Sequence, residues 1–526
     1  MKPDFDVVVV GFGPAGAACT GLLGKLGVRT LAIDRSRDIY DKPRAFALDH
    51  EIMRVFQQLG AAEDVKPHTA PFTPSEYYGM DGQLIKRLGS VPPPYPLGWP
   101  PNMVFTQPPV EAALRKHAAA FASVELALGT ELVSFTQSAD AVALEVRDGA
   151  IAGRTVGARY VIGCDGASST VRTLCGMRYD DLDFDEPWLV VDMLVNDQGA
   201  AKLPNVSLHH CEPARPSTYL IGPGNHRRWE LMLLPGEDPK GMASKEGVWR
   251  LLSRWITPED ATLWRVAAYR FHALVASEWR RGRVFISGDA AHQQPPFTGQ
   301  GMCQGVRDVA NLSWKLHLAL QGRAGERLLD TYAAERGAHV RRYTTLIKGL
   351  GRIICERDPV AARARDRRLL DEAGGTVQTV PRQHLLPPLE AGLISAAAHP
   401  ANGTIFPQPR VRSGDGVALM DSVCGTGFRI VVDSGFPLSA LRRRDRVERL
   451  GATVVRIGEG PGAATSDGAR ALAECDGVMA GWFERYQCSA AIVRPDNYVY
   501  GVAASAESLD NQLERISEII PGAATA

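Results

Sequence analysis

The chain has 526 residues, of which 59 are basic and 59 acidic, and 45% of its residues are hydrophobic. This hydrophobic fraction is ordinary for a globular protein and excludes a largely disordered chain. A formal net charge of zero provides no overall attraction to nucleic acid or to an anionic membrane, and we expect neither as a partner. Length alone predicts roughly two to four domains.

Signals for a membrane span, for secretion and for a disulfide framework are missing from the sequence. No apolar run reaches the about 18 residues that a spanning helix requires, so we expect no membrane span. The N-terminus lacks the pattern of a signal peptide. The nine cysteines are scattered and include no C-x-x-C pair, which argues against a disulfide framework, a zinc site or a dithiol redox centre. We therefore expect a cytoplasmic protein without a bound metal.

The first elements of the chain predict a βαβ unit. Residues 5–10 are a short, valine-rich run that suits a parallel strand buried on both faces. Small and apolar residues follow at helical spacing up to Gly27, and residues 28–34 form a second strand pattern. The glycine motif Gly11-x-Gly13-x-x-Gly16 lies between the strand and the helix.

Each glycine of this motif has a physical role in binding a dinucleotide. The first allows a tight turn, the second lets a diphosphate approach the backbone, and the third lets helix and strand pack closely. The helix N-terminus then offers free N–H groups to the phosphates. Asp34, about 20 residues further on, could accept hydrogen bonds from a ribose. The alternative is a structural glycine turn in an unrelated α/β protein.

Three further regions of strands follow. Residues 158–164 form a strand pattern that ends at Asp165-Gly166, and residues 284–287 form another that ends at Gly288-Asp289. Between them, alternating segments in 185–275 predict antiparallel strands with one solvated face. After Asp289, which could hold a sugar-chain hydroxyl, a Gly-rich loop leads into a helix whose first N–H groups could face an electron-accepting ring.

The second half of the chain predicts helices and then a separate domain. Apolar residues recur at helical spacing from Val306 to about Ile354. A Pro- and Arg-rich stretch near 356–390 has the composition of a connector. The last 120 or so residues carry four strand patterns and a closing helix near 509–520, which is enough for a small α/β domain.

Three motifs now stand in order along the chain: Gly11-x-Gly13-x-x-Gly16, Asp165-Gly166, and Gly288-Asp289 with its Gly-rich loop. In this order and at these separations they resemble the class A flavoprotein aromatic hydroxylases, which are single-component FAD monooxygenases of the p-hydroxybenzoate hydroxylase fold. The resemblance extends from the N-terminus to about residue 345. Segments that begin at Pro43, Phe105, Glu212 and Arg227 resemble the 3-(3-hydroxyphenyl)propionate hydroxylase branch. The C-terminal part resembles the thioredoxin-like tail of longer members, although it lacks the redox cysteine pair, and we expect it to be structural or a docking surface.

The resemblance implies an α/β fold with a Rossmann-like FAD-binding domain, an inserted antiparallel substrate sheet and a thioredoxin-like C-terminal α/β domain. We expect the FAD-binding domain in residues 1–184 and, with a helical connector, in 276–390. The substrate sheet is expected mainly in 185–275 and the C-terminal domain in 391–526. A homodimer is a further expectation.

The motifs and the resemblance together assign FAD contacts and a substrate region. The expected FAD contacts are Gly11, Gly13, Pro14, Ala15, Gly16, Asp34, Arg35, Arg44, Gln107, Asp165, Gly166, Gly288, Asp289, Gly299, Gln300, Gly301 and Met302. The resemblance places the backbone of Pro295 and Pro296 beside the substrate ring. His292 could relay protons or, as we favour, pack near the flavin edge.

Candidates for proton transfer and for anion binding lie in the expected substrate sheet. His209, His210 or Tyr219 could take a phenolic proton, although for any one of them we favour an ordinary strand residue. Arg215 or Arg228 could pair with a substrate carboxylate, or form a surface salt bridge instead.

The resemblance implies that the chain hydroxylates a phenolic aromatic compound such as 3-(3-hydroxyphenyl)propionate. NAD(P)H would reduce FAD, O2 would add to it, and the flavin C4a-hydroperoxide would hydroxylate the ring. NAD(P)H is expected as a transient co-substrate, because no second G-x-G-x-x-G is apparent. Two alternatives stay open: a monooxygenase of a polyketide or other larger aromatic, and a non-catalytic protein that binds flavin or an aromatic ligand.

Overall fold

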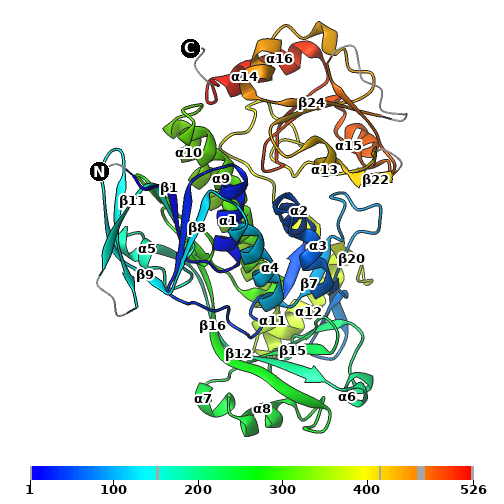
Figure 1. Ribbon diagram of the computed structural model, residues 1–526. Coiled ribbons are helices and arrows are strands. Elements are labelled where there is room, and N and C mark those ends of the chain that lie inside the picture. The colour runs from blue at the N-terminus through cyan, green and yellow to red at the C-terminus, as the bar shows by residue number, and fades with distance from the viewer. Residues whose placement is uncertain (1–2, 150–152, 414–415, 459–467, 523–526) are drawn as a thin grey trace.

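The computed structural model describes residues 3–149, 153–413, 416–458 and 468–522. Figure 1 shows three regions. The N-terminal sheet and its helices occupy the middle, a second sheet with β12 and β15 lies at the bottom, and the C-terminal part, in orange and red, lies at the top. These regions correspond to the α/β architecture that the sequence predicts.

The first sheet has eight strands and is built around β1, in which the four consecutive valines are buried. Strand β1 pairs in parallel with β11 and with β2, and these pair in parallel with β18 and β8. The strands are β1 Phe5–Val10, β2 Thr30–Asp34, β8 Val124–Leu128, β9 Thr130–Gln137, β10 Val142–Asp148, β11 Arg154–Gly163, β17 Arg280–Arg281 and β18 Val284–Ile286. The strands expected in 5–10, 28–34, 158–164 and 284–287 are confirmed.

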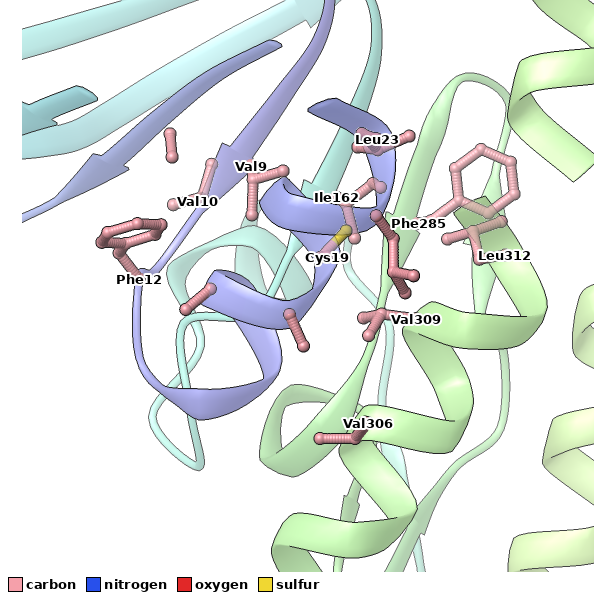
Figure 2. Close-up of a cluster of buried hydrophobic side chains, with 14 of the residues drawn as sticks. Val9, Val10, Phe12, Cys19, Leu23, Ile162, Phe285, Val306, Val309 and Leu312 are labelled. Carbon is pink, nitrogen blue, oxygen red and sulfur yellow. The ribbon is translucent and has the colours of Figure 1, made fainter. Parts of the chain in front are cut away.

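Helix α1 (Pro14–Lys25) packs between this sheet and the long helix α9 (Gly301–Leu320). Figure 2 shows Cys19 and Leu23 of α1 beside Ile162 of β11 and Val309 of α9. All four side chains are fully buried. This contact places the N-terminal ends of α1 and α9, and the two glycine loops that precede them, at the same edge of the sheet.

Helices α10 and α11 lie within the stretch 306–354 for which the sequence predicts helical spacing, with a short π-helical segment at Ala333–Gly337 between them, whereas the other helices of the N-terminal region were not predicted. They are α2 His50–Leu59, α3 Ala62–Val65, α4 Gln107–Ala119, α5 Thr170–Leu174, α10 Glu326–Tyr332 and α11 Ala338–Cys355. A small three-stranded sheet precedes α4, with β3 Ala47–Asp49, β4 Thr69–Pro71 and β7 Asn102–Phe105.

The second sheet has nine strands and contains more of the chain than the segment 185–275. Its long strands β12 and β16 pair with each other in antiparallel register, as the alternating patterns predict. Four of its strands come from elsewhere in the chain: β5 Ser75–Tyr78, β6 Leu84–Gly89, β19 His292–Gln293 and β20 Thr379–Pro381. The others are β12 Tyr179–Val195, β13 Ser207–His210, β14 Ser217–Ile221, β15 His226–Met232 and β16 Ala261–Ala276. Three short helices also belong here: α6 Asp197–Lys202, α7 Pro239–Met242 and α8 Lys245–Leu252.

The stretch 356–390, for which the sequence predicts a helical connector, contains regular secondary structure. It contains helix α12 (Pro359–Glu372), whose N-terminus is capped by the Asp358 carboxylate accepting from Ala361 N at 2.8 Å. The helix has few apolar residues, so hydrophobic periodicity does not reveal it. Strand β20 then pairs with β6 of the second sheet. A short 3-10 helix begins at Arg382, and this arginine lines the cavity described below.

The C-terminal region contains a five-stranded mixed sheet in which the four predicted strands are confirmed. Its central strand β23 is parallel to β24 and antiparallel to β26. The strands are β23 Arg429–Val432, β24 Thr453–Gly458, β25 Arg470–Ala473, β26 Ala490–Val493 and β27 Val499–Ala503, with a separate hairpin of β21 Arg410–Ser413 and β22 Gly416–Leu419. The helices are α13 Met420–Cys424, α14 Arg444–Leu450, α15 Val478–Tyr486 and α16 Ala506–Ser517. The thioredoxin-like assignment stays a prediction.

Two expectations from the sequence, one about membrane spans and one about cysteines, concern the whole described part of the chain. Among its helices, none combines the length and the apolar character needed to cross a bilayer. All nine cysteines are free thiols.

Candidate active site

One large cavity, of about 1120 Å³, joins the carboxyl edge of the first sheet to one face of the second sheet. Its walls include the loops that follow β1, β2, β11 and β18. They also include residues of β12, β13, β14 and β15. A ligand in this cavity would therefore contact both the Rossmann-like sheet and the antiparallel sheet.

The Gly11 loop is shaped for a diphosphate. Gly11 has φ +94°, and a Cβ there would lie 2.5 Å from the carbonyl oxygen of Cys164. At Gly13, by contrast, a Cβ would meet no atom within 4 Å, so the backbone is open to the cavity. Gly13 caps α1 without any side-chain hydrogen bond, and the first turn of α1 contains no acidic residue. The first N–H groups of α1 are thus available to an anion.

Asp34 holds the loop in place and lines the same cavity. Its Oδ2 accepts a hydrogen bond from Phe12 N and its Oδ1 accepts one from Ser36 N, both at 2.7 Å. A carboxylate has about four acceptor positions, so these two bonds leave capacity for ribose hydroxyls.

The Asp165-Gly166 motif is connected to the loop after β18. Asp165 accepts hydrogen bonds from Ser169 Oγ and Val171 N at the start of α5. Arg172 donates to the hydroxyl of Tyr179 at 2.7 Å, and this hydroxyl donates to the carbonyl of Asp289 at 2.6 Å. The segment that follows Asp165-Gly166 therefore positions the backbone of the Gly288-Asp289 motif.

Asp289 lines the cavity and is exposed to it, and its carboxylate makes no hydrogen bond to another described residue. The walls of the cavity around the carboxylate desolvate it and raise its pKa. An acceptor without a protein partner in this position suits the hydroxyls of a sugar chain.

His292 lies behind the loop, outside the cavity lining. Its Nε2 is 2.8 Å from Asp308 Oδ2, and its ring stacks on Trp279 with 5.6 Å between centroids. Asp308 also accepts from Gly288 N at 3.0 Å. His292 thus supports the loop through Asp308, and its place near the flavin edge stays a prediction.

The loop before α9 provides a second helix N-terminus at the cavity. Gly299 has φ +64°, and a Cβ there would be 2.6 Å from Ala47 Cβ. Gly301 and Met302 line the cavity, and the first turn of α9 contains no acidic residue. The side chain of Gln300 accepts from Arg307 at 2.9 Å.

Most of the residues expected to contact FAD share this cavity. The lining contains Gly11, Gly13, Pro14, Ala15, Asp34, Arg35, Arg44, Gln107, Asp165, Gly166, Gly288, Asp289, Gly299, Gly301 and Met302. Gly16 and Gln300 do not line it; a Cβ at Gly16 would be 1.9 Å from Gly11 O, so its role is packing. Pro296 lines the cavity and Pro295 does not.

His210 and Tyr219 are not brought to the cavity. Tyr219 packs against Trp229, and its hydroxyl donates to Pro204 O at 3.3 Å. His210 lies near Trp255 and Glu212. Strand alternation explains this placement, because neighbouring residues of one strand point to opposite faces of the sheet. His209 and Thr218, one residue earlier in each case, do line the cavity.

Neither arginine considered for a substrate carboxylate is free. Arg215 pairs with Glu237 at 2.6 Å and does not line the cavity. Arg228 reaches the cavity but pairs with the buried Asp192 at 2.7 Å, and its guanidinium also donates to Arg44 O at 2.9 Å. Arg228 therefore holds the FAD-side loop against the substrate sheet.

Arg382 is a cavity cation that the sequence interpretation missed. It is 8% exposed, forms no ion pair with a described residue, and donates to the carbonyl of Thr298 in the loop before α9. Its guanidinium lies over the ring of Phe72 at 4.2 Å. Burial lowers its pKa. A buried cation without a carboxylate partner is costly unless a ligand supplies one. The only sequence signal was a basic residue in a stretch interpreted as a connector.

Comparison with known proteins agrees with this geometry. The FAD binding domain family matches residues 4–346, and the HcaD C-terminal domain family matches residues 403–518. A probable NADH-specific resorcinol 4-hydroxylase of Rhodococcus jostii (strain RHA1) is 37% identical over 508 residues, which cover 96% of this chain and 93% of the relative. A 3-(3-hydroxy-phenyl)propionate/3-hydroxycinnamic acid hydroxylase of Mycolicibacterium gilvum (strain PYR-GCK) is 36% identical over 517 residues, covering 95% and 89%.

Solved structures share the fold over the whole chain. The flavin-dependent monooxygenase PieE in complex with FAD and substrate has a TM-score of 0.81 at 22% identity, covering 99% of this chain and all of that one. Aklavinone-11 hydroxylase with FAD and aklavinone has a TM-score of 0.78 at 21% identity, covering 98% and 100%. The sequence match to the family and the full-length relatives, together with the cavity geometry, show that the chain belongs to the class A FAD-dependent aromatic hydroxylases.

Proposed function

We propose that this enzyme hydroxylates a single-ring phenol that carries an acidic side chain, with NADH and O2 as co-substrates. The observation that carries the proposal is the single cavity in which the Gly11, Asp289 and Gly299 loops face a substrate wall containing an unpaired buried arginine, Arg382. The names of the relatives support a phenolic substrate, and one of them supports NADH.

FAD, when bound, would supply the redox and O2 chemistry that side chains cannot provide. The diphosphate would lie on the N-terminus of α1, a ribose on Asp34, and the ribityl chain near Asp289. The flavin ring would face the start of α9. The remaining expected FAD contacts on the cavity wall, including Arg44 and Gln107, are proposed on the same basis.

The substrate end of the cavity would hold the phenol against aromatic side chains. Phe271 and Phe297 line this end, and both are nearly buried. Their rings are 5.9 Å apart at an interplanar angle of 85°, and Phe297 also packs edge-on against Trp188. We infer that this aromatic wall and the backbone at Pro296 place the ring, while Arg382 binds the acidic group through charge-assisted hydrogen bonds.

Several coarser properties belong to the same proposal. Free thiols throughout the chain are consistent with a reducing compartment such as the cytoplasm. The boundaries 1–184, 185–275, 276–390 and 391–526, the thioredoxin-like nature of the last segment, and a homodimer remain proposals.

The test is anaerobic stopped-flow reduction of the purified protein by NADH and by NADPH, with 3-(3-hydroxyphenyl)propionate, resorcinol or a multi-ring phenol present. We expect bound FAD, strong acceleration of NADH oxidation by the phenolic acid, and hydroxylated product in air. Acceleration only by multi-ring phenols would replace the substrate with a polyketide-type aromatic. Flavin binding without phenol-dependent turnover would identify a non-catalytic binding protein.

A further inference from the structure

A row of side chains crosses the substrate sheet and faces the cavity. His209 of β13 is in register with Thr218 of β14, Thr218 with Glu230 of β15, and Glu230 with Val190 of β12. All four residues line the cavity. Residues in register on adjacent strands lie about 5 Å apart at Cβ, so Glu230 has Thr218 and Val190 as its immediate neighbours.

Glu230 is the acidic residue of this row, and its carboxylate is unpaired. The residue is 4% exposed, and the side chain makes no hydrogen bond or ion pair with another described residue. Buried carboxylates are normally paired or hydrogen-bonded. A carboxylate without such a partner, in the wall of a substrate cavity, is available to a group on the ligand.

The same row contains a histidine, but its properties differ. His209 stacks on Tyr77 with 4.2 Å between ring centroids, and its Nδ1 lies 3.1 Å from Thr218 Oγ1. Burial lowers the pKa of His209 to about 3. At neutral pH the imidazole is therefore uncharged and a weak base, suited to hydrogen bonding and not to accepting a phenolic proton.

Burial has the opposite effect on Glu230 and raises its pKa to about 7. The positive charge of Arg228 lowers this pKa and the negative charge of Asp192 raises it. Asp192 also accepts from His226 and pairs with Arg265. Besides Arg228, the arginines that line the cavity are Arg35, Arg37, Arg44, Arg115, Arg265, Arg270 and Arg382. With this pKa, Glu230 is near half ionised at neutral pH, the range in which a general base works efficiently.

We propose that Glu230 is the catalytic base that accepts the phenolic proton of the substrate; this assignment rests on the proposed function and names the base for that reaction. The step transfers one proton and no electrons. The substrate O–H bond breaks, an O–H bond forms on the Glu230 carboxylate, and the electron pair stays on the phenolate oxygen. The electron-rich phenolate is the form of the ring that is best suited to hydroxylation.

The first experiment is an ultraviolet difference titration of bound 3-(3-hydroxyphenyl)propionate with pH, which requires no turnover. In the wild-type holoenzyme we expect the absorption band of the bound phenol to move to longer wavelength as pH rises through about 7, because the ionised Glu230 then accepts a hydrogen bond from the phenolic O–H. In Glu230→Gln this step near pH 7 should be absent, and only ionisation of the phenol itself, usually at about pH 10, should change the spectrum. An identical titration in both proteins would overturn the assignment, even if hydroxylation itself were not observed.

The second experiment is the pH dependence of kcat/KM for product formation. Activity of the wild type should rise with pH through about 7, because Glu230 must be deprotonated to accept a proton. Glu230→Gln should lose this limb and about 100-fold or more in rate, whereas Glu230→Asp should retain part of both. Glu246, exposed on α8, provides the matched control: Glu246→Gln should behave as wild type.

The two proposals fail in different ways. If the wild type forms no hydroxylated product with any phenol, the proposed function is wrong, while the binding titration still reports on Glu230. If the wild type hydroxylates and Glu230→Gln keeps its bound FAD, its pH profile and its rate, only the Glu230 assignment is wrong. Flavin absorbance at equal protein concentration verifies that each variant is folded.

Discussion

The hydroxyl of Tyr498 in the C-terminal region donates a 2.9 Å hydrogen bond to Glu51 at the start of α2, 447 residues earlier in the chain. Glu51 also accepts from Arg307 Nε at 2.7 Å, and Arg307 Nη1 donates to Gln300 Oε1 at 2.9 Å. Gln300 belongs to the loop before α9. A continuous set of hydrogen bonds therefore joins the C-terminal region to the loop before α9.

Tyr498→Phe should weaken this connection. Glu51 would lose one hydrogen bond to a charged group, which costs about 1.5–3 kcal/mol. We expect a lower free energy of unfolding and weaker retention of FAD, measured by denaturant titration and by flavin fluorescence after dilution. Tyr486→Phe, in the same region but with no hydroxyl contact among the described residues, is the control. Equal FAD retention in both variants would mean that the C-terminal region does not influence the loop.

Gly16→Ala should abolish FAD binding. A Cβ at residue 16 would be 1.9 Å from the carbonyl oxygen of Gly11, so the Gly11 loop must move. Overpacking of this kind lowers the free energy of unfolding by about 1–3 kcal/mol. The ratio of flavin to protein absorbance in the purified variant measures the effect. Gly349→Ala is matched, because a Cβ there meets no atom within 4 Å, and it should keep full flavin content.

Arg382→Met tests the acidic group of the substrate. Loss of a charge-assisted hydrogen bond should raise KM for 3-(3-hydroxyphenyl)propionate about 10- to 100-fold. Resorcinol, which has no carboxylate, should change far less. Steady-state NADH oxidation coupled to product analysis separates the two cases, and Arg363→Met on the exposed side of α12 serves as control. A similar rise in KM for both phenols would refute carboxylate binding by Arg382.

Glu335→Gln should reduce stability in a pH-dependent way. Arg494 of the C-terminal region and Lys315 of α9 hold the pKa of the buried Glu335 carboxyl at about 2, below its usual 4.5. The stabilisation is therefore complete above pH 4.5 and is lost as pH falls toward 2. Breaking such a buried pair costs about 3–5 kcal/mol at pH 7. Urea unfolding between pH 7 and pH 3 should show a steeper loss in wild type than in Glu335→Gln. Glu507→Gln on α16 should match wild type.

The parts of the site that local sequence could predict are those formed by contiguous residues. The Gly11 loop and the Gly288-Asp289 loop each combine a strand, a turn and a helix start within a few residues, so composition and spacing are sufficient. The predicted βαβ unit and the strands around it are confirmed for this reason.

Glu230 and Arg382 could not be recognised in this way. The cavity position of Glu230 depends on the register of β15 with β12 and β14, which is set by long-range pairing. The same register turns Tyr219 and His210 away from the cavity and brings His209 to it. Arg382 depends on β20 pairing with β6, almost 300 residues away in sequence. Single-residue patterns contain no information about such pairings.

The position of Arg382 on the segment after α12 has a consequence for how the enzyme can diverge. The residues of this segment other than Arg382 do not line the described cavity, and the glycine loops lie far from it in sequence. If Arg382 binds the acidic group as proposed, a substitution at this one position can alter the charge preference for the substrate while the glycine loops keep their sequence. The charge preference is then encoded in a different stretch of the gene from the glycine loops, whereas Phe297 of the aromatic wall shares its loop with Gly299, and natural selection can act on the charge preference separately.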